Sequence, residues 1–205
     1  MKRMLSLLLF VMFLACSTSV MGQNKNHWRT STEEVTYRKA DKPLKRNKIK
    51  FTYSFEKNEE GEWAYIVVEG YVNKSTIVFT SRSNLVEPKQ NKPDGDGWIN
   101  ERDINFDGVP DLLIYLGLQS WGQVATFYDA YVWNVEKACF DHVDIFDSIG
   151  EPMFDEENHC ITSTGRDGPD HFTTQTYEWK DGELVLTKEV TEEADWVEEE
   201  EEEEN

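Results

Sequence analysis

Hydrophobic and polar residues alternate strictly over residues 49–56. The apolar members, which would share one face of an extended chain, are Ile49, Phe51, Tyr53 and Phe55. Neighbouring side chains of a β-strand point to opposite faces of the sheet. The pattern therefore predicts a strand with one buried face and one face in water.

Further stretches along the chain are short and rich in apolar, β-branched and aromatic residues. They cover residues 63–72, 76–80, 112–116, 124–135, 139–145, 159–163, 173–179 and 183–190. Turn-forming residues separate them, most clearly at 58–61, 89–97 and 180–182. No window of eleven residues shows a convincing helical period. The sequence therefore predicts an all-β fold of antiparallel hairpins, in an irregular propeller-like or a sandwich arrangement.

The N-terminus has the pattern of a secretory signal peptide over residues 1–22. Two basic residues precede an apolar run from Met4 to Ala15, which is shorter than the roughly 20 residues that a membrane-spanning helix needs. Small side chains favour cleavage before Gln23. Lipidation at Cys16 is the alternative. Either form predicts an exported protein of the periplasm, cell surface or medium, without a transmembrane segment.

The acidic residues of the chain lie mainly in residues 47–191 and in residues 192–205. The chain has 21 Lys and Arg against 40 Asp and Glu, a formal net charge of −19, which disfavours nucleic acid as a partner. Residues 192–205 hold ten acids and no base, and we expect a disordered acidic tail there. Residues 23–46 form a polar, basic leader. A single β domain, itself acidic, is expected over 47–191.

One motif carries recognisable metal chemistry, the stretch D-x-N-x-D-G-x-x-D at residues 103–111. Alternating oxygen-bearing side chains can curl around Ca²⁺, which takes six to eight oxygen ligands, and Gly108 permits the sharp turn. The predicted ligands are Asp103, Asn105, Asp107, the carbonyl of Val109, and Asp111. A metal-free turn held by its own Asp and Asn side chains is the alternative.

The motif and its continuation, D-L-x-I-x-x-G, resemble the FG-GAP calcium loop between two strands of integrin-type propeller blades. They are also similar to single-calcium-loop proteins of bacterial envelopes. Among these are periplasmic lipoproteins that inhibit peptidoglycan hydrolases and are associated with bacterial-killing type IV secretion systems. The resemblance covers roughly residues 98–190, and it rests on residues 128–133, 152–155, 161–163, 166–168 and 177–184. It implies a calcium-binding β protein that neutralises a peptidoglycan hydrolase of lysozyme type.

The sequence leaves two other functions open. A carbohydrate-binding or scaffold module of the cell envelope would take cell-wall glycan as its partner, and Trp121 in the loop 119–123 would suit either sugar or protein binding. A hydrolase with paired carboxylates is the third reading. Because no nucleophile elbow, zinc-protease helix or phosphate-binding loop occurs, we expect a non-enzymatic protein.

Two cysteines remain after the signal peptide, Cys139 and Cys160. In an oxidising compartment they are candidates for a disulfide between neighbouring strands, and two free thiols are the alternative. A zinc site with His142 and His159 is a weaker interpretation, because adjacent residues such as His159 and Cys160 point to opposite faces of a strand.

Overall fold

The computed structural model describes residues 34–36, 44–119, 124–166, 168 and 170–193. Within them the chain forms three four-stranded antiparallel sheets that do not close into a barrel, so the predicted all-β class is confirmed. The signal peptide with Cys16, Trp121 and the acidic tail beyond Glu193 lie outside the described residues. No helix in the described part of the chain is long and apolar enough to span a membrane.

The first sheet, sheet A, has the strand order β1-β4-β3-β2. These strands are β1 (Glu34–Thr36), β2 (Lys50–Lys57), β3 (Trp63–Val72) and β4 (Thr76–Lys89). Strand β2 shows the predicted alternation, because its aromatic residues are partly or fully buried while its polar residues are all exposed. The short 3₁₀ turn η1 (Arg46–Lys48) leads into it.

The leader predicted for residues 23–46 contributes to this fold where it is described. Strand β1 pairs with β4, with Val35 opposite Ser81. Arg46 is only 6% exposed, and Leu44 packs against the core. The folded body therefore begins before residue 47. The sequence pattern did not indicate this earlier start, because a three-residue strand and a single buried arginine are too short to give a periodic pattern.

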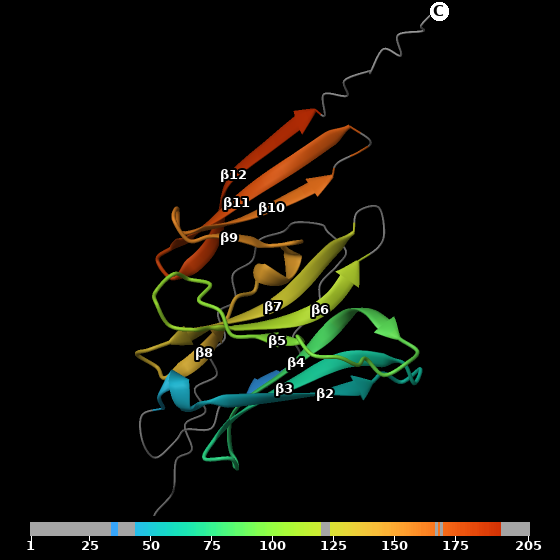
Figure 1. Ribbon diagram of the computed structural model, residues 1–205, viewed down its shortest axis with the longest axis vertical. Coiled ribbons are helices and arrows are strands. Elements are labelled where there is room, and N and C mark those ends of the chain that lie inside the picture. The colour runs from blue at the N-terminus through green and yellow to red at the C-terminus, as the bar shows by residue number, and fades with distance from the viewer. Residues whose placement is uncertain (1–33, 37–43, 120–123, 167, 169, 194–205) are drawn as a thin grey trace, which may run out of the picture.

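Sheet B has the order β5-β6-β7-β8 and lies between the other two sheets (Figure 1). It consists of β5 (Ile99–Asn100), β6 (Leu112–Gln119), β7 (Ala125–Asn134) and β8 (Cys139–His142). The middle position explains why residues 112–116 form a continuous apolar run instead of alternating. A strand covered on both faces can place an apolar side chain at every position.

Sheet C has the order β12-β11-β10-β9 and lies on the opposite side of sheet B from sheet A (Figure 1). Its strands are β9 (Met153–Asp155), β10 (Cys160–Arg166), β11 (His171–Lys180) and β12 (Glu183–Glu193). The turn between β11 and β12 at Asp181 and Gly182 has positive φ at both residues, as the hairpin signal predicts. The 3₁₀ turn η2 (Phe146–Ser148) lies between sheets B and C along the chain.

Two hydrophobic cores separate the three layers. The first core lies between sheets A and B, and its fully buried members include Phe79 of β4, Ile114 of β6 and Tyr131 of β7. The second core lies between sheets B and C and includes Leu113 of β6 and Ile161 of β10. Consecutive residues of β6 thus enter different cores, which makes sheet B the common wall of both.

Candidate functional site

The loop 103–111 connects β5 to β6 and folds back on its own backbone. The backbone N–H groups of Asp107 and Gly108 donate to the two carboxylate oxygens of Asp103, at 3.1 and 2.7 Å. Phe106 and Gly108 both have positive φ, 61° and 86°, which winds the chain around these contacts. Glycine adopts this conformation without steric penalty, so the predicted role of Gly108 in the turn agrees with the geometry.

Asn105 and Asp107 complete the polar face of the loop. The Asn105 Oδ1 atom accepts from the Asp107 N–H at 3.2 Å, and its Nδ2 donates to Asp107 Oδ2 at 3.0 Å. The other oxygen of Asp107 accepts from the Val109 N–H at 2.8 Å. Oxygen atoms of three of the five predicted ligands, Asp103, Asn105 and Asp107, therefore gather around one short stretch of backbone.

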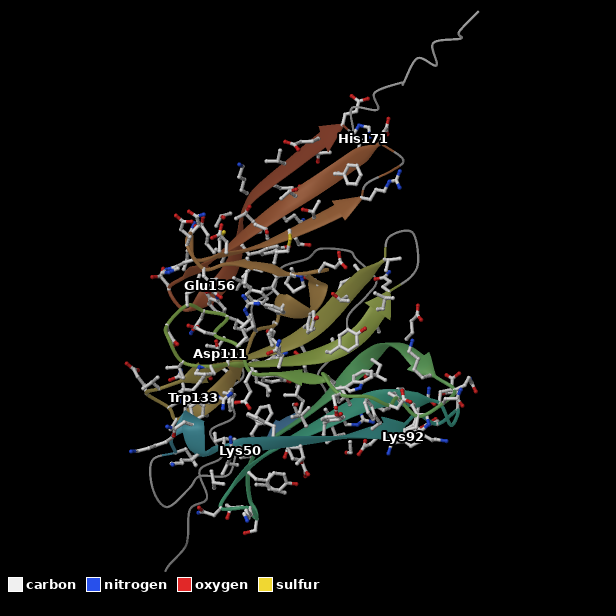
Figure 2. The ribbon with its side chains drawn as sticks, viewed as in Figure 1. Lys50, Lys92, Asp111, Trp133, Glu156 and His171 are labelled. Carbon is white, nitrogen blue, oxygen red and sulfur yellow. The ribbon has the colours of Figure 1, made fainter. Side chains whose placement is uncertain are left out.

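Asp111 has a different role from the other three acidic or amide residues of the motif. It is fully buried beside Trp133 (Figure 2). Its oxygens accept the backbone N–H of Trp133 at 2.8 Å and of Ile104 at 2.9 Å. Burial raises the pKa of this carboxyl to about 6, and the charges of Asp107 and Asp103 act in the same direction. Through its two hydrogen bonds, Asp111 ties Ile104 at the start of the loop to Trp133 of strand β7.

The chemistry of these donors suits Ca²⁺, a hard cation that prefers oxygen ligands. Asp103, Asn105 and Asp107 would hold the ion, together with the carbonyl of Val109. Among the described residues, however, no three or more Asp, Glu, His or Cys side chains are arranged around a common point where a metal ion would lie. The agreement with the calcium prediction is thus one of donor type and loop winding, and the metal itself stays a prediction.

The same loop connects sheet C to the rest of the molecule. The Trp179 indole N–H of β11 donates to the Ile104 carbonyl at 2.8 Å. The rings of Phe106 and His159 stack with an interplanar angle of 8° and centroids 5.2 Å apart. Ile104 itself is fully buried in the second core. Residues from the loop thus pack directly on sheet C, although β11 is about 75 positions further along the chain.

Arg46 joins the base of the loop to the beginning of sheet A. Its guanidinium donates to the Pro110 carbonyl at 2.6 Å and to the Asp111 carbonyl at 3.1 Å, and it pairs with Glu101 at 2.9 Å. Its charge also lies over the ring of Phe51, 5.1 Å from the centroid. The sequence alone does not reveal this role of Arg46, because nothing in its local pattern distinguishes it from the other bases of the leader.

A second polar cluster, also missed from sequence, lies in the first core around Asp129. This carboxylate is 1% exposed and accepts from Ser83 of β4 at 2.5 Å and from Tyr131 at 3.0 Å. His142 of β8 contacts it at 2.6 Å through Nε2 and contacts the exposed Asp144 at 2.6 Å through Nδ1. The cluster therefore joins sheets A and B across their shared core.

The protonation of this cluster follows from its contacts. Burial acts to raise the pKa of Asp129, but the hydrogen bond and charge of His142, with the donors from Ser83 and Tyr131, hold that pKa below its usual value. Burial acts to lower the pKa of His142, but Asp129 and then Asp144 raise it to about 9. His142 is therefore charged and Asp129 is ionised at neutral pH.

The structure differs from the predicted disulfide. Cys139 and Cys160 do not form a disulfide: Cys139 is half-buried on β8 of sheet B, and Cys160 is buried on β10 of sheet C. The premise of neighbouring strands does not hold, because the chain changes sheet between them. The zinc interpretation loses its basis as well, since His142 binds two carboxylates and His159 stacks on Phe106.

No protein-family model matches the chain, and no curated protein matches it. A similar solved structure is described as the structure of a Xanthomonas type IV secretion system related protein. It shares 19% sequence identity with this chain, over 80% of this chain and 87% of the other, with a TM-score of 0.49. Similarity at this level supports neither a shared partner nor a shared function.

Proposed function

We propose that the protein is an exported, non-enzymatic binding protein whose loop 103–111 holds one Ca²⁺. The observation that carries the proposal is the convergence of oxygen atoms from Asp103, Asn105 and Asp107 on the backbone of the loop. Asp111 would add its negative charge from the base of the loop while its oxygens keep their N–H partners. The exported location is inferred from the signal pattern of residues 1–22.

The ion would have a structural role. It would offset the repulsion between carboxylates that lie close together, and it would fix a loop that touches both sheet B and sheet C. Extracellular sites of this kind bind with dissociation constants of about 10⁻⁴–10⁻³ M, which suits a compartment rich in calcium. The loop would thus be occupied outside the cell.

Thermal melting with and without calcium tests this site. We expect saturating Ca²⁺ to raise the melting temperature of the chelator-treated protein by about 5–10 °C, because an ion at 100 times its dissociation constant stabilises by about 2.7 kcal/mol. Asp107→Asn should remove the shift. Asp94→Asn, which changes an exposed acid outside the loop, should retain it. An equal shift in the Asp107 variant would place the ion elsewhere.

For the partner, we propose a cationic peptidoglycan hydrolase of lysozyme type. Residues 47–191 hold twelve Lys and Arg against twenty-seven Asp and Glu, so the folded body would attract a basic enzyme and speed its association. The resemblance of residues 98–190 to envelope inhibitors supports the same partner. We expect the protein to inhibit cell-wall lysis by a cationic lysozyme in proportion to its concentration, and to do so less strongly at high ionic strength.

The assay also separates the two other functions. Tight binding to insoluble peptidoglycan without inhibition would indicate the glycan-binding module. Release of soluble fragments by the protein alone would indicate the carboxylate hydrolase. Inhibition that is unchanged between low and high salt would contradict the electrostatic part of the proposal.

A further inference from the structure

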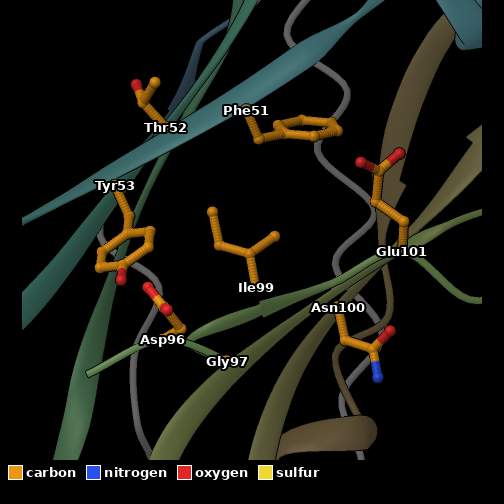
Figure 3. Close-up of a pocket in the computed structure, with 8 residues that line it drawn as sticks. All are labelled: Phe51, Thr52, Tyr53, Asp96, Gly97, Ile99, Asn100 and Glu101. Carbon is orange, nitrogen blue, oxygen red and sulfur yellow. The ribbon is translucent and has the colours of Figure 1, made fainter.

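A groove of about 560 Å³ runs along the open edge between sheets A and B (Figure 3). One wall is formed by Phe51, Thr52 and Tyr53 of β2, and the other by Ile99, Asn100 and Glu101 in and beside β5. In the picture, Ile99 projects between Phe51 and Tyr53. Within the described residues, β2 and β5 are the terminal strands of their sheets, so each has one backbone edge without a neighbouring strand.

Two contacts hold the walls of the groove at a fixed separation. The Tyr53 hydroxyl donates to the Gly95 carbonyl at 3.0 Å, which ties β2 to the loop before β5. Arg46, which precedes β2, pairs with Glu101 at 2.9 Å, just beyond β5. The space between the edges is therefore part of the folded structure and is bounded by groups from both sheets.

The aromatic residues of the groove are already engaged within the protein. The Phe51 ring packs edge-on against Phe79 and Phe140, and the Arg46 guanidinium covers it. Tyr53 packs edge-on against Phe55. A sugar ring needs an open aromatic face to stack on, so these rings do not form a platform for glycan. The groups that remain for binding are the backbone edges, the exposed part of the Ile99 side chain and the Asp96 carboxylate.

The charge of the groove favours a cationic occupant. Asp96 lines the groove and is exposed, and no hydrogen bond or ion pair connects it to another described residue. Glu101 is balanced by Arg46, and the lysines at the two ends of β2, Lys50 and Lys57, do not line the groove. Asp96 therefore leaves the lining of the groove with an excess negative charge. A basic side chain placed opposite Asp96 would neutralise it, whereas an acidic segment would meet repulsion.

From this geometry we infer a second site, in which an extended, basic segment of a partner protein adds as a strand along β2. The eight residues of β2 provide the longer backbone edge, Ile99 provides an apolar contact, and Asp96 selects a Lys or Arg. Backbone pairing of this kind gives affinity, and alternate side chains give specificity. The site is separate from the calcium loop and goes beyond the function proposed above.

Fluorescence anisotropy with the full mature chain tests the site. The probe is a labelled eight-residue peptide of alternating Lys and Val. Its comparison peptides are the Glu–Val sequence and the Lys–Val sequence with alternate backbone nitrogens methylated. We expect saturable binding of the first peptide, no measurable binding of the acidic one, and at least about tenfold weaker binding of the methylated one, because it loses several backbone donors.

Variants then locate the binding. Asp96→Asn should weaken the binding of the Lys–Val peptide about two- to fivefold, which is the effect expected for the loss of one exposed ion pair. Glu183→Gln, which removes an exposed carboxylate from sheet C, should leave its affinity unchanged. Equal binding of the methylated peptide, an unchanged affinity in Asp96→Asn, or no binding at all would overturn the inference. Displacement by an N-acetylglucosamine oligosaccharide would instead identify a glycan site.

Discussion

At the scale of single residues, Asp129 shows how a charge is accommodated in the first core. Its carboxylate receives hydrogen bonds from Ser83, Tyr131 and the backbone N–H of Ala130, and it faces His142. Removing a partner from a buried charge costs more than the net value of the pair, because the remaining charge is left in a medium of low polarity. The cluster is therefore expected to be a sensitive point of the fold.

We expect His142→Gln to lower the free energy of unfolding by about 2–3 kcal/mol near pH 6, the size of hydrogen bonds to charged groups. Folding raises the pKa of His142, so its contribution is complete below the unfolded value of about 6.5 and is lost as the pH rises through about 9. Folding lowers the pKa of Asp129, so its contribution is present above about 3.9 and is lost as the pH falls through the folded value.

Urea unfolding of the wild type and the variant, measured from pH 4 to pH 10, checks this dependence. The difference between the two proteins should be largest near pH 5–6 and should shrink toward pH 10. His171→Gln is the control, because His171 pairs with Asp170 at the surface, where both side chains are more than a third exposed. It should change stability by less than about 0.5 kcal/mol. A His142 effect that is constant over this range would contradict the assignment.

At the scale of elements, sequence analysis predicted most of the long strands and missed the short ones. The alternation at residues 49–55 and the turn at 180–182 are local signals, and both correspond to observed elements. Strands β1, β5 and β9 contain only two or three residues each, which is too few for any period to appear. They form because neighbouring strands pair with them.

The loop 103–111 was located from its motif, but its connection to sheet C was not. The motif fixes the spacing of Asp103, Asn105 and Asp107, and these three contact the same backbone segment. Nothing in the local sequence indicates that Trp179 donates to the carbonyl of Ile104. Contacts between residues so far apart in the chain depend on how the sheets stack, which short-range patterns do not encode.

Trp179→Phe tests whether this hydrogen bond holds sheet C. The substitution removes the N–H donor and leaves the buried Ile104 carbonyl unpaired, so we expect a loss of about 1–3 kcal/mol and faster amide exchange in β10 to β12. Trp98→Phe is the matched control, because the Trp98 N–H donates to Asp94 at the surface. Similar exchange in both variants would mean that the loop does not restrain sheet C.

At the scale of the whole molecule, the three layers share one middle sheet. Sequence analysis predicted hairpins but not the order of the sheets, because β6 and β7 send side chains into both cores and their pattern resembles any buried strand. The acidic composition did not reveal what the individual acids do. The sequence shows that acids occur both in a C-terminal run and in the folded body. Only the tertiary contacts show that Asp111 and Asp129 accept hydrogen bonds that hold the structure together.

Deletion of residues 194–205 separates the tail from the folded body. Strand β12 ends at Glu193, so the deletion removes no described hydrogen bond. We expect the free energy of unfolding to change by less than about 0.5 kcal/mol. We also expect the salt dependence of lysozyme inhibition to become weaker, because eight acids are lost. A marked loss of stability, measured by urea unfolding, would show that the tail packs on the body.

The central claim, that loop 103–111 binds calcium, is tested most directly by calorimetric titration of Ca²⁺ into the chelator-treated protein. The account predicts one ion per chain, with a dissociation constant of about 10⁻⁴–10⁻³ M, and no binding in Asp107→Asn. Absence of binding in the wild-type protein, or the same binding in the variant, would contradict it.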